Sequence, residues 1–214
     1  MKEYGFLSGS EVTVEMTEWK RSKVDGEPHD HAFEKASSEM QVATIKSERC
    51  EDGTSFKSSV TSMIKSMTVL KTTKSGFEGY LKDKYTLLPE TTERCLATEL
   101  DCTWTYDSSV NHDEQCIDYR AQRSRLRELL LKGIFGPSKG GVYSASLQAT
   151  IYDAACIVLA DELLGSIWSI KLFTPNLHYL PMKNLEMLGE TFEDDIFIPT
   201  SEPSGTITCT VCRE

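Results

Sequence analysis

Hydrophobic and polar residues alternate along several stretches of the chain, which is the pattern of half-buried β-strands. Residues 95–106 are the most regular stretch, and one face of it holds Leu96, Thr98, Leu100, Cys102, Trp104 and Tyr106. Weaker patterns predict strands near 12–17, from about 31 to 45 with a break at Ser37 and Ser38, over 60–72, over 166–173 through Trp168, Ile170 and Leu172, and over 205–212. Polar residues and glycines predict turns or loops at 22–30, 46–59 and 73–79.

Two stretches instead repeat with the period of a helix. The first carries Leu126, Leu129, Leu130 and Ile134 and ends at Gly136-Pro137. A capping box at Asn111–Glu114 predicts where this helix begins. The second helix carries Leu147, Ile151, Ala155, Val158 and Leu159 along one side. Both are amphipathic, so we expect each to cover a sheet.

The predicted order is four strands, two helices and two strands, which favours an antiparallel sheet with helices on one face, an α+β fold. Residues 58–214 would form one complete ββααββ unit. Residues 1–57 would supply only the two strands of another unit. Because a pair of strands is marginally stable alone, we expect residues 1–57 to pair with the rest of the chain or with another subunit.

Composition narrows the classes of partner. The 214 residues include 23 basic and 33 acidic side chains, a net charge of −10, which disfavours nucleic-acid binding. No apolar run approaches the roughly 18 residues of a membrane span, and the N-terminus lacks the apolar segment of a secretion signal. We therefore expect neither nucleic acid nor membrane as a partner.

Seven irregularly spaced cysteines without a secretion signal favour a reduced, intracellular protein. Cys209 and Cys212 have C-x-x-C spacing, but on a strand they would point to opposite faces. A zinc site needs a second pair of ligands, and none has usable spacing. His29 and His31 could share a strand face, yet no third ligand accompanies them. We predict no metal site.

Several longer motifs occur in a fixed order. They are residues 69–98 (VLKTTKSGFEGYLKDKYTLLPETTERCLAT), 143–152 (YSASLQATIY), 174–179 (TPNLHY) and 205–211 (GTITCTV), preceded by 19–21 (WKR) and 29–33 (HDHAF). From about residue 11 to its end, the sequence resembles the urate oxidase (uricase) family. The resemblance implies a T-fold, in which each chain has two tandem ββααββ units. It also implies a homotetramer, a tunnel-shaped barrel with sites between subunits.

The resemblance implies an oxidoreductase of purine catabolism that converts urate, O2 and water to 5-hydroxyisourate and H2O2. The family uses no metal and no organic cofactor, so we expect none here. Urate, O2 and other urate oxidase subunits are the implied partners. A peroxisomal location is implied as well, although residues 211–214 (VCRE) depart from the usual C-terminal Ser-Lys-Leu signal; without that signal, the location would be cytoplasmic.

The matching motifs also imply roles for single residues. Phe77 would stack on the purine, and Arg94 would bind a urate carbonyl and ring nitrogen with its planar fork. Gln148 would pair with the opposite amide edge, and Leu147 would offer its backbone amide. Taken alone, each has a plainer interpretation: a core aromatic, a surface arginine, a solvent-facing glutamine and a core leucine.

Asn176 and His178 are two residues apart, so on a strand they share a face. The resemblance places Asn176 above the ring, where O2 or water binds, and His178 in a proton relay. A Lys–Thr pair of that relay and an Asp that contacts urate belong to the first ββαα, to which no part of this sequence corresponds. We expect half of a site, and little or no turnover from this chain alone.

Two other functions stay open at this point. The chain could be a non-catalytic short form that associates with full-length subunits, which predicts association without peroxide formation. It could also be another purine- or pterin-binding T-fold enzyme. Those enzymes typically use a metal or an acidic anchor for the heterocycle, and the set of Phe77, Arg94 and Gln148 disfavours that interpretation.

Overall fold

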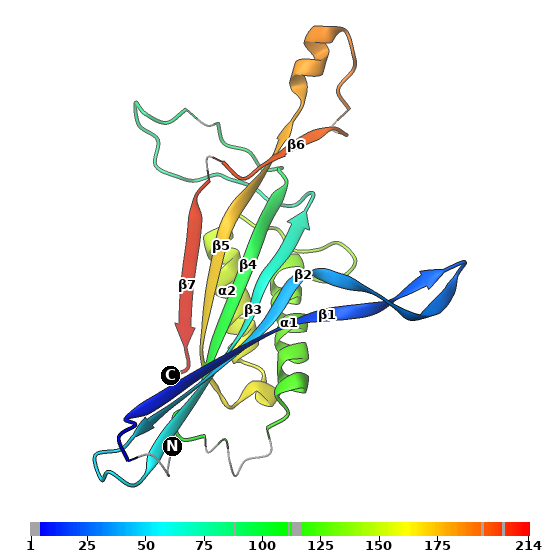
Figure 1. The fold of residues 1–214 in the computed structure, drawn as a ribbon. Coiled ribbons are helices and arrows are strands. Elements are labelled where there is room, and N and C mark those ends of the chain that lie inside the picture. The colour runs from blue at the N-terminus through cyan, green and yellow to red at the C-terminus, as the bar shows by residue number, and fades with distance from the viewer. Residues whose placement is uncertain (1–4, 88, 111, 113–116, 194, 203) are drawn as a thin grey trace.

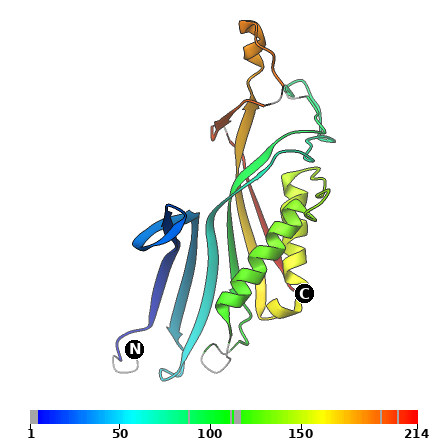
Figure 2. The same ribbon diagram turned by 90° about the vertical axis from the view of Figure 1, so that its right-hand side faces the viewer.

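The computed structural model describes residues 5–87, 89–110, 112, 117–193, 195–202 and 204–214. Within them, an antiparallel sheet of seven strands carries two helices on one face (Figures 1 and 2). The strand order is β1-β2-β3-β4-β5-β6, and β7 also pairs with β5. The predicted α+β class and antiparallel pairing are confirmed. The strands are β1 (Gly9–Val24), β2 (Glu27–Arg49), β3 (Phe56–Lys71), β4 (Leu96–Tyr106), β5 (Ile167–Pro181), β6 (Phe197–Thr200) and β7 (Thr206–Cys212).

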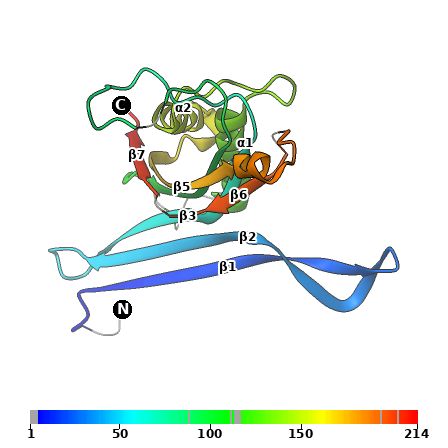
Figure 3. The same ribbon diagram turned by 90° about the horizontal axis from the view of Figure 1, so that it is seen from above.

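Strands β1 and β2 form a long hairpin that extends past the helix-covered part of the sheet (Figure 3). Asp25 and Gly26 turn the chain, and both have positive φ, as a two-residue hairpin turn requires. The predicted break near Ser37 and Ser38 is a bulge, because Thr17 pairs with Met40 whereas Trp19 pairs with Lys35. Four residues of β2 therefore lie opposite one residue of β1.

The predicted loop at 46–59 is wrong at both ends. Strand β2 continues to Arg49 and β3 begins at Phe56, which leaves only residues 50–55 as the connection. Ser47 and Ser58 face each other across these strands, with their hydroxyl oxygens 2.7 Å apart. Both faces are largely exposed at this end of the sheet, so the strands need no hydrophobic alternation there.

The hydrophobic core lies between the sheet and the helices α1 (Tyr119–Phe135) and α2 (Leu147–Leu159). Every apolar position predicted to face the core on both helices is buried, as is the predicted face of β4. The helices approach closely where a Cβ on Gly133 would lie 2.6 Å from Ala154. Glycine is needed there because any side chain would push the helices apart.

Helix α1 begins after Asp118, whose carboxylate accepts a hydrogen bond from the backbone N–H of Ala121. The predicted cap at Asn111–Glu114 lies outside the described residues except for His112, and the helix starts later than that cap implied. Gly136 ends α1 at φ 76°, as predicted. No helix among the described residues is long and apolar enough to cross a membrane.

Strand β5 is longer than predicted and differs at its start. Ile167 is buried, whereas Trp168 is 42% exposed. The pairing register shifts between Thr105, opposite Ser169, and Tyr106, opposite Ile167, so the predicted alternation of Trp168 with Ile170 and Leu172 is wrong at its first position. After β5 come a short 3-10 helix (Lys183–Leu188) and β6, neither of which the pattern predicted.

Candidate functional site

The loop between β3 and β4 is tied to the start of α2. The backbone N–H of Gly76 donates to Ser144 (2.8 Å), and the N–H of Ser144 donates to Lys74 (2.9 Å). Gly76 itself lies under Tyr143, because a Cβ added to it would meet the Tyr143 hydroxyl. The Phe77 N–H donates to Thr91 at 2.7 Å. These bonds fix Phe77 next to the loop that enters α2.

Phe77 and Arg94 contact each other in this loop. The guanidinium carbon of Arg94 lies 5.3 Å from the centre of the Phe77 ring. Tyr80 stacks on Phe77, with 4.5 Å between ring centres and 22° between ring planes. A cation thus lies over an aromatic ring, and these two groups are suited to bind a flat anionic ligand.

Two polar side-chain groups at this contact have no hydrogen-bond partner in the described structure. They are the Arg94 Nε and the Ser75 hydroxyl, and both are buried. The Arg94 backbone N–H donates to the Ser75 carbonyl at 2.9 Å, which makes the two residues neighbours. Burial also lowers the pKa of Arg94. Since buried polar groups are nearly always hydrogen-bonded, this pair indicates a site that a ligand or a rearrangement completes.

The first turn of α2 supplies the next predicted residues. Ser146 caps the helix by accepting a hydrogen bond from the Ala149 N–H at 3.2 Å. Leu147 is 4% exposed and belongs to the core, and Gln148 is exposed. The first N–H groups of a helix have no partner within it. The start of α2 can therefore present a backbone donor at Leu147 and an amide at Gln148.

Asn176 and His178 lie on β5, next to β4. Asn176 pairs with Thr98 and His178 with Thr200 of β6. Residues opposite each other on paired strands share a face. Thr98 is buried with Leu96 and Leu100, so Asn176 and His178 lie on the helix-covered face, and both side chains are half-buried.

The six predicted residues therefore lie at one end of the sheet, on three different segments of the chain. Phe77 and Arg94 are in contact, Leu147 and Gln148 follow the segment that bonds to the Phe77 loop, and β5 carries Asn176 and His178. Sequence reasoning missed the neighbours Ser75, Tyr80 and Tyr143. The only signal for them was their position within the same two motifs.

The alternative metal ligands do not form a cluster. The His29 and His31 rings are 6.3 Å apart, and the His31 N–H donates to the His29 ring nitrogen Nδ1 at 3.1 Å. In the part of the chain that the structure describes, no group of three or more His, Cys, Asp or Glu side chains could hold a metal ion. Cys209 faces the core and Cys212 is exposed, as their predicted opposite orientation requires.

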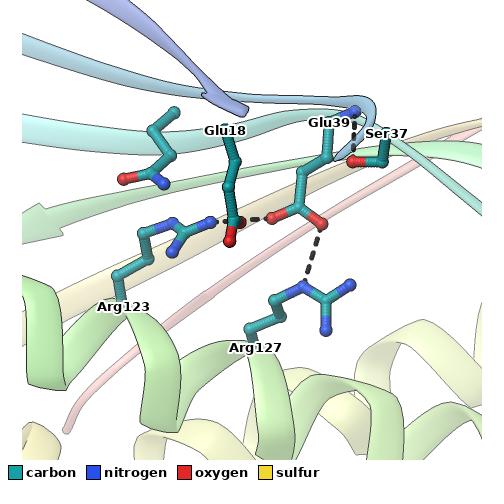
Figure 4. Close-up of a pocket in the computed structure, with 6 residues that line it drawn as sticks. Glu18, Ser37, Glu39, Arg123 and Arg127 are labelled. Atoms are coloured by element: carbon teal, nitrogen blue, oxygen red, sulfur yellow. Dashed lines mark hydrogen bonds and ion pairs between the residues drawn. The ribbon is translucent and has the colours of Figure 1, made fainter. Parts of the chain in front are cut away.

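A second polar cluster joins the hairpin to α1 (Figure 4). A cavity of about 270 Å³ is lined there by Glu18, Ser37, Glu39, Gln41, Arg123 and Arg127. The Glu39 carboxylate, only 9% exposed, accepts from Arg123 at 3.0 Å and from Arg127 at 2.9 Å. Because these charges neutralise one another, we interpret the cluster as an anchor for the β2 bulge.

An antiparallel sheet of this order, with two helices between β4 and β5 on one face and an aromatic–guanidinium site at its end, defines a T-fold protein. The family model described as Uricase matches residues 60–208. Uricase-2 isozyme 1 of Glycine max is 36% identical, over 98% of this chain and 67% of its own length. Uricase of Arabidopsis thaliana is 38% identical, over 91% of this chain and 62% of its own. The chain belongs to the uricase family.

The solved structures agree. The crystal structure of uricase from Arthrobacter globiformis matches with a TM-score of 0.80 at 30% identity, and the match covers 99% of this chain and 66% of that one. A urate oxidase from Bacillus sp. TB-90 matches with a TM-score of 0.74 at 18% identity, which shows a shared fold. This chain spans about two thirds of the length of these relatives.

Proposed function

We propose that this chain provides the urate-recognition half of a urate oxidase. The reaction consumes urate, O2 and water and yields 5-hydroxyisourate and H2O2. The observation that carries the proposal is the contact between the Phe77 ring and the Arg94 guanidinium. A planar anion satisfies both residues at once, since it offers a face to Phe77 and acceptor atoms to Arg94.

The remaining residues would then have two roles: some would bind urate, and others would take part in the reaction. Gln148 and the Leu147 N–H would hold the far edge of the urate ring and fix its orientation. Asn176 would position O2 or water above the ring, and His178 would move the proton that leaves urate or the attacking water. With urate as the electron donor and O2 as the acceptor, the electron balance closes without a further cofactor.

The assembly is part of the same proposal. We propose that residues 58–214 form one complete T-fold unit, that residues 1–57 form two strands of another, and that chains of this family associate around the site. The outer residues of the β1–β2 hairpin support this, because Val12, Val14 and Met16 are about half exposed. The peroxisomal location stays a prediction, which imaging of a tagged chain in its source cell would test.

The decisive experiment separates binding from turnover. Urate binding to the purified chain is measured under nitrogen by calorimetry, and the oligomeric mass is measured in the same sample. We expect saturable binding, weakened about 10–100-fold by Arg94→Gln, because hydrogen bonds to a charged group are lost. Arg120→Gln, an exposed change on α1, is the matched control. Absence of urate binding by the folded wild-type chain would contradict the proposal.

Peroxide release in air, in chelator-treated buffer, then separates the remaining functions. Urate-dependent H2O2 formation means that the chain completes a site by itself. Urate binding without H2O2 fits a half-site that needs further residues, and adding a full-length uricase should then restore turnover. Binding that disappears with the chelator would favour a metal-dependent heterocycle enzyme and contradict the proposal.

A further inference from the structure

Unpartnered buried polar atoms are concentrated at one place in this molecule. Among the described residues, three buried side-chain atoms lack a hydrogen-bond partner: the Ser75 hydroxyl, the Arg94 Nε and the Gln122 Oε1. Two of the three therefore belong to neighbouring residues at the proposed urate site. A buried donor or acceptor without a partner destabilises the fold, so two such groups together call for an explanation.

The two groups are chemically complementary. The Arg94 Nε carries a hydrogen that it can only donate, and a serine hydroxyl oxygen can accept it. Their backbones are already joined, because the Arg94 N–H donates to the Ser75 carbonyl at 2.9 Å. Ser75 is fully buried, and its neighbours on both sides are held by backbone bonds. The hydroxyl therefore has a fixed place, and the longer Arg94 side chain is the member that can move.

The serine next to it in space shows the ordinary arrangement. Ser144, which bridges to Ser75 across the two segments, is also buried. Its hydroxyl lies 2.6 Å from the Thr150 hydroxyl and 3.3 Å from the Ser146 carbonyl. A buried serine at this point of the fold can thus have hydrogen-bond partners for its hydroxyl. The isolation of the Ser75 hydroxyl is specific to its own position.

We propose that Ser75 is a positioning residue for Arg94: when urate is bound, the Ser75 hydroxyl accepts a hydrogen bond from the Arg94 Nε–H. This inference rests on the proposed function. The bond would fix the plane of the guanidinium, so that its two terminal nitrogens point together at the urate edge. Ser75 does not touch the ligand, and it acts only through Arg94. In the free protein, the two groups stay apart, and their unpaired state favours binding.

The test compares two buried serines with opposite expectations. Ser75→Ala removes an unsatisfied hydroxyl, so the urea midpoint of unfolding should stay constant or rise, while the Kd for urate rises about 5–10-fold. Ser144→Ala removes a satisfied hydroxyl, so the urea midpoint should fall and the Kd should stay within about twofold. Ser75→Cys puts a thiol, which is a poor acceptor, in the place of the hydroxyl, and it should bind urate like Ser75→Ala.

The outcomes also separate this inference from the proposed function. If the wild-type chain binds no urate, the proposed function fails, and this inference fails with it. If the wild type binds urate and Ser75→Ala binds it equally well, only the role of Ser75 is overturned. A Ser75→Ala chain with a lowered urea midpoint and unchanged Kd would show an ordinary structural serine, which also overturns it. Circular dichroism of each variant confirms that it is folded.

Discussion

The helix-covered half of the sheet and the β1–β2 hairpin are built from the same kind of strand but differ in what they bury. Strands β4 and β5 hold fully buried residues such as Leu100, Trp104, Ile170 and Leu172. No described side chain of β1 is buried, and the buried side chain of β2 is the carboxylate of Glu39. Burial of apolar surface is the main source of folding free energy. The helix-covered half therefore supplies most of the stability of the chain, and the hairpin leaves apolar side chains such as Val12 and Val14 exposed.

The largest expected effect comes from a substitution that leaves a cavity in the core. Leu130→Ala, at a fully buried position of α1, should lower the free energy of unfolding by about 3 kcal/mol, because it removes apolar contacts and leaves a cavity. Val14→Ala on β1, where the side chain is 60% exposed, should cost less than about 0.5 kcal/mol. Urea unfolding of both variants measures this difference. Equal losses would show that the hairpin carries as much stability as the core.

The next test breaks the polar link between the two regions. Glu39→Ala leaves Arg123 and Arg127 without their carboxylate, and it should cost about 2 kcal/mol. The expected loss is below that of a fully buried pair, because Arg127 is 41% exposed. Glu15→Ala removes an exposed pair with Lys65 and should cost less than about 1 kcal/mol. If both variants lose the same free energy in urea unfolding, the cluster is no anchor.

A smaller effect is expected at the start of α2. Ser146→Ala removes the cap on the Ala149 N–H and should cost about 1 kcal/mol. Ser138→Ala, in the exposed loop after α1, is the control and should be neutral within about 0.5 kcal/mol. Thermal unfolding followed by circular dichroism measures both. A neutral Ser146→Ala would mean that water or a neighbour replaces the cap.

The smallest expected effect is a loss of stability at low pH, and it comes from Asp52 in the turn between β2 and β3. The Asp52 carboxylate accepts hydrogen bonds from the Ser55 hydroxyl, the Ser55 N–H and the Thr54 N–H. These bonds lower the pKa of Asp52 from 3.8 to about 2. Because the folded-state pKa is the lower one, the stabilisation is present above pH 3.8 and is lost as the pH falls toward 2.

Asp52→Asn removes that charge and should narrow the difference between the urea midpoints at pH 5 and pH 2.5. The other carboxylates contribute to both proteins alike, so the comparison isolates Asp52. An unchanged difference would contradict the role of these three hydrogen bonds.

Periodicity predicted the parts of the fold that have one buried and one exposed face. The apolar positions of β4, α1 and α2 are the examples, because burial imposes a period of two or 3.6. It failed where neither face is buried, as at Arg49 and Phe56, and where a register shift exposes Trp168. Strand β6 lies outside the core and has no buried residue, so its sequence shows no alternation that predicts a strand.

The site was predicted from a resemblance between motifs rather than from pattern, and its supporting residues were not predicted at all. The sequence shows that Phe77 and Arg94 belong to one segment, but their contact depends on a loop that folds back. The unpaired Ser75 hydroxyl has no signal in the sequence, because satisfaction of a hydrogen bond depends on neighbours in space. A sequence can thus predict the chemistry of a side chain, whereas its hydrogen-bond partners become known only from the structure.

Strand β1 lies at one end of the strand order, so its outer backbone edge meets no strand among the described residues. Along this strand, Val12, Val14 and Met16 are separated by Thr13 and Glu15 and preceded by Glu11. Open edges can add a strand from any chain, and charged side chains only discourage it. Such pairing takes two chains, so in a cell the share of newly made copies that join through this edge would rise with their concentration.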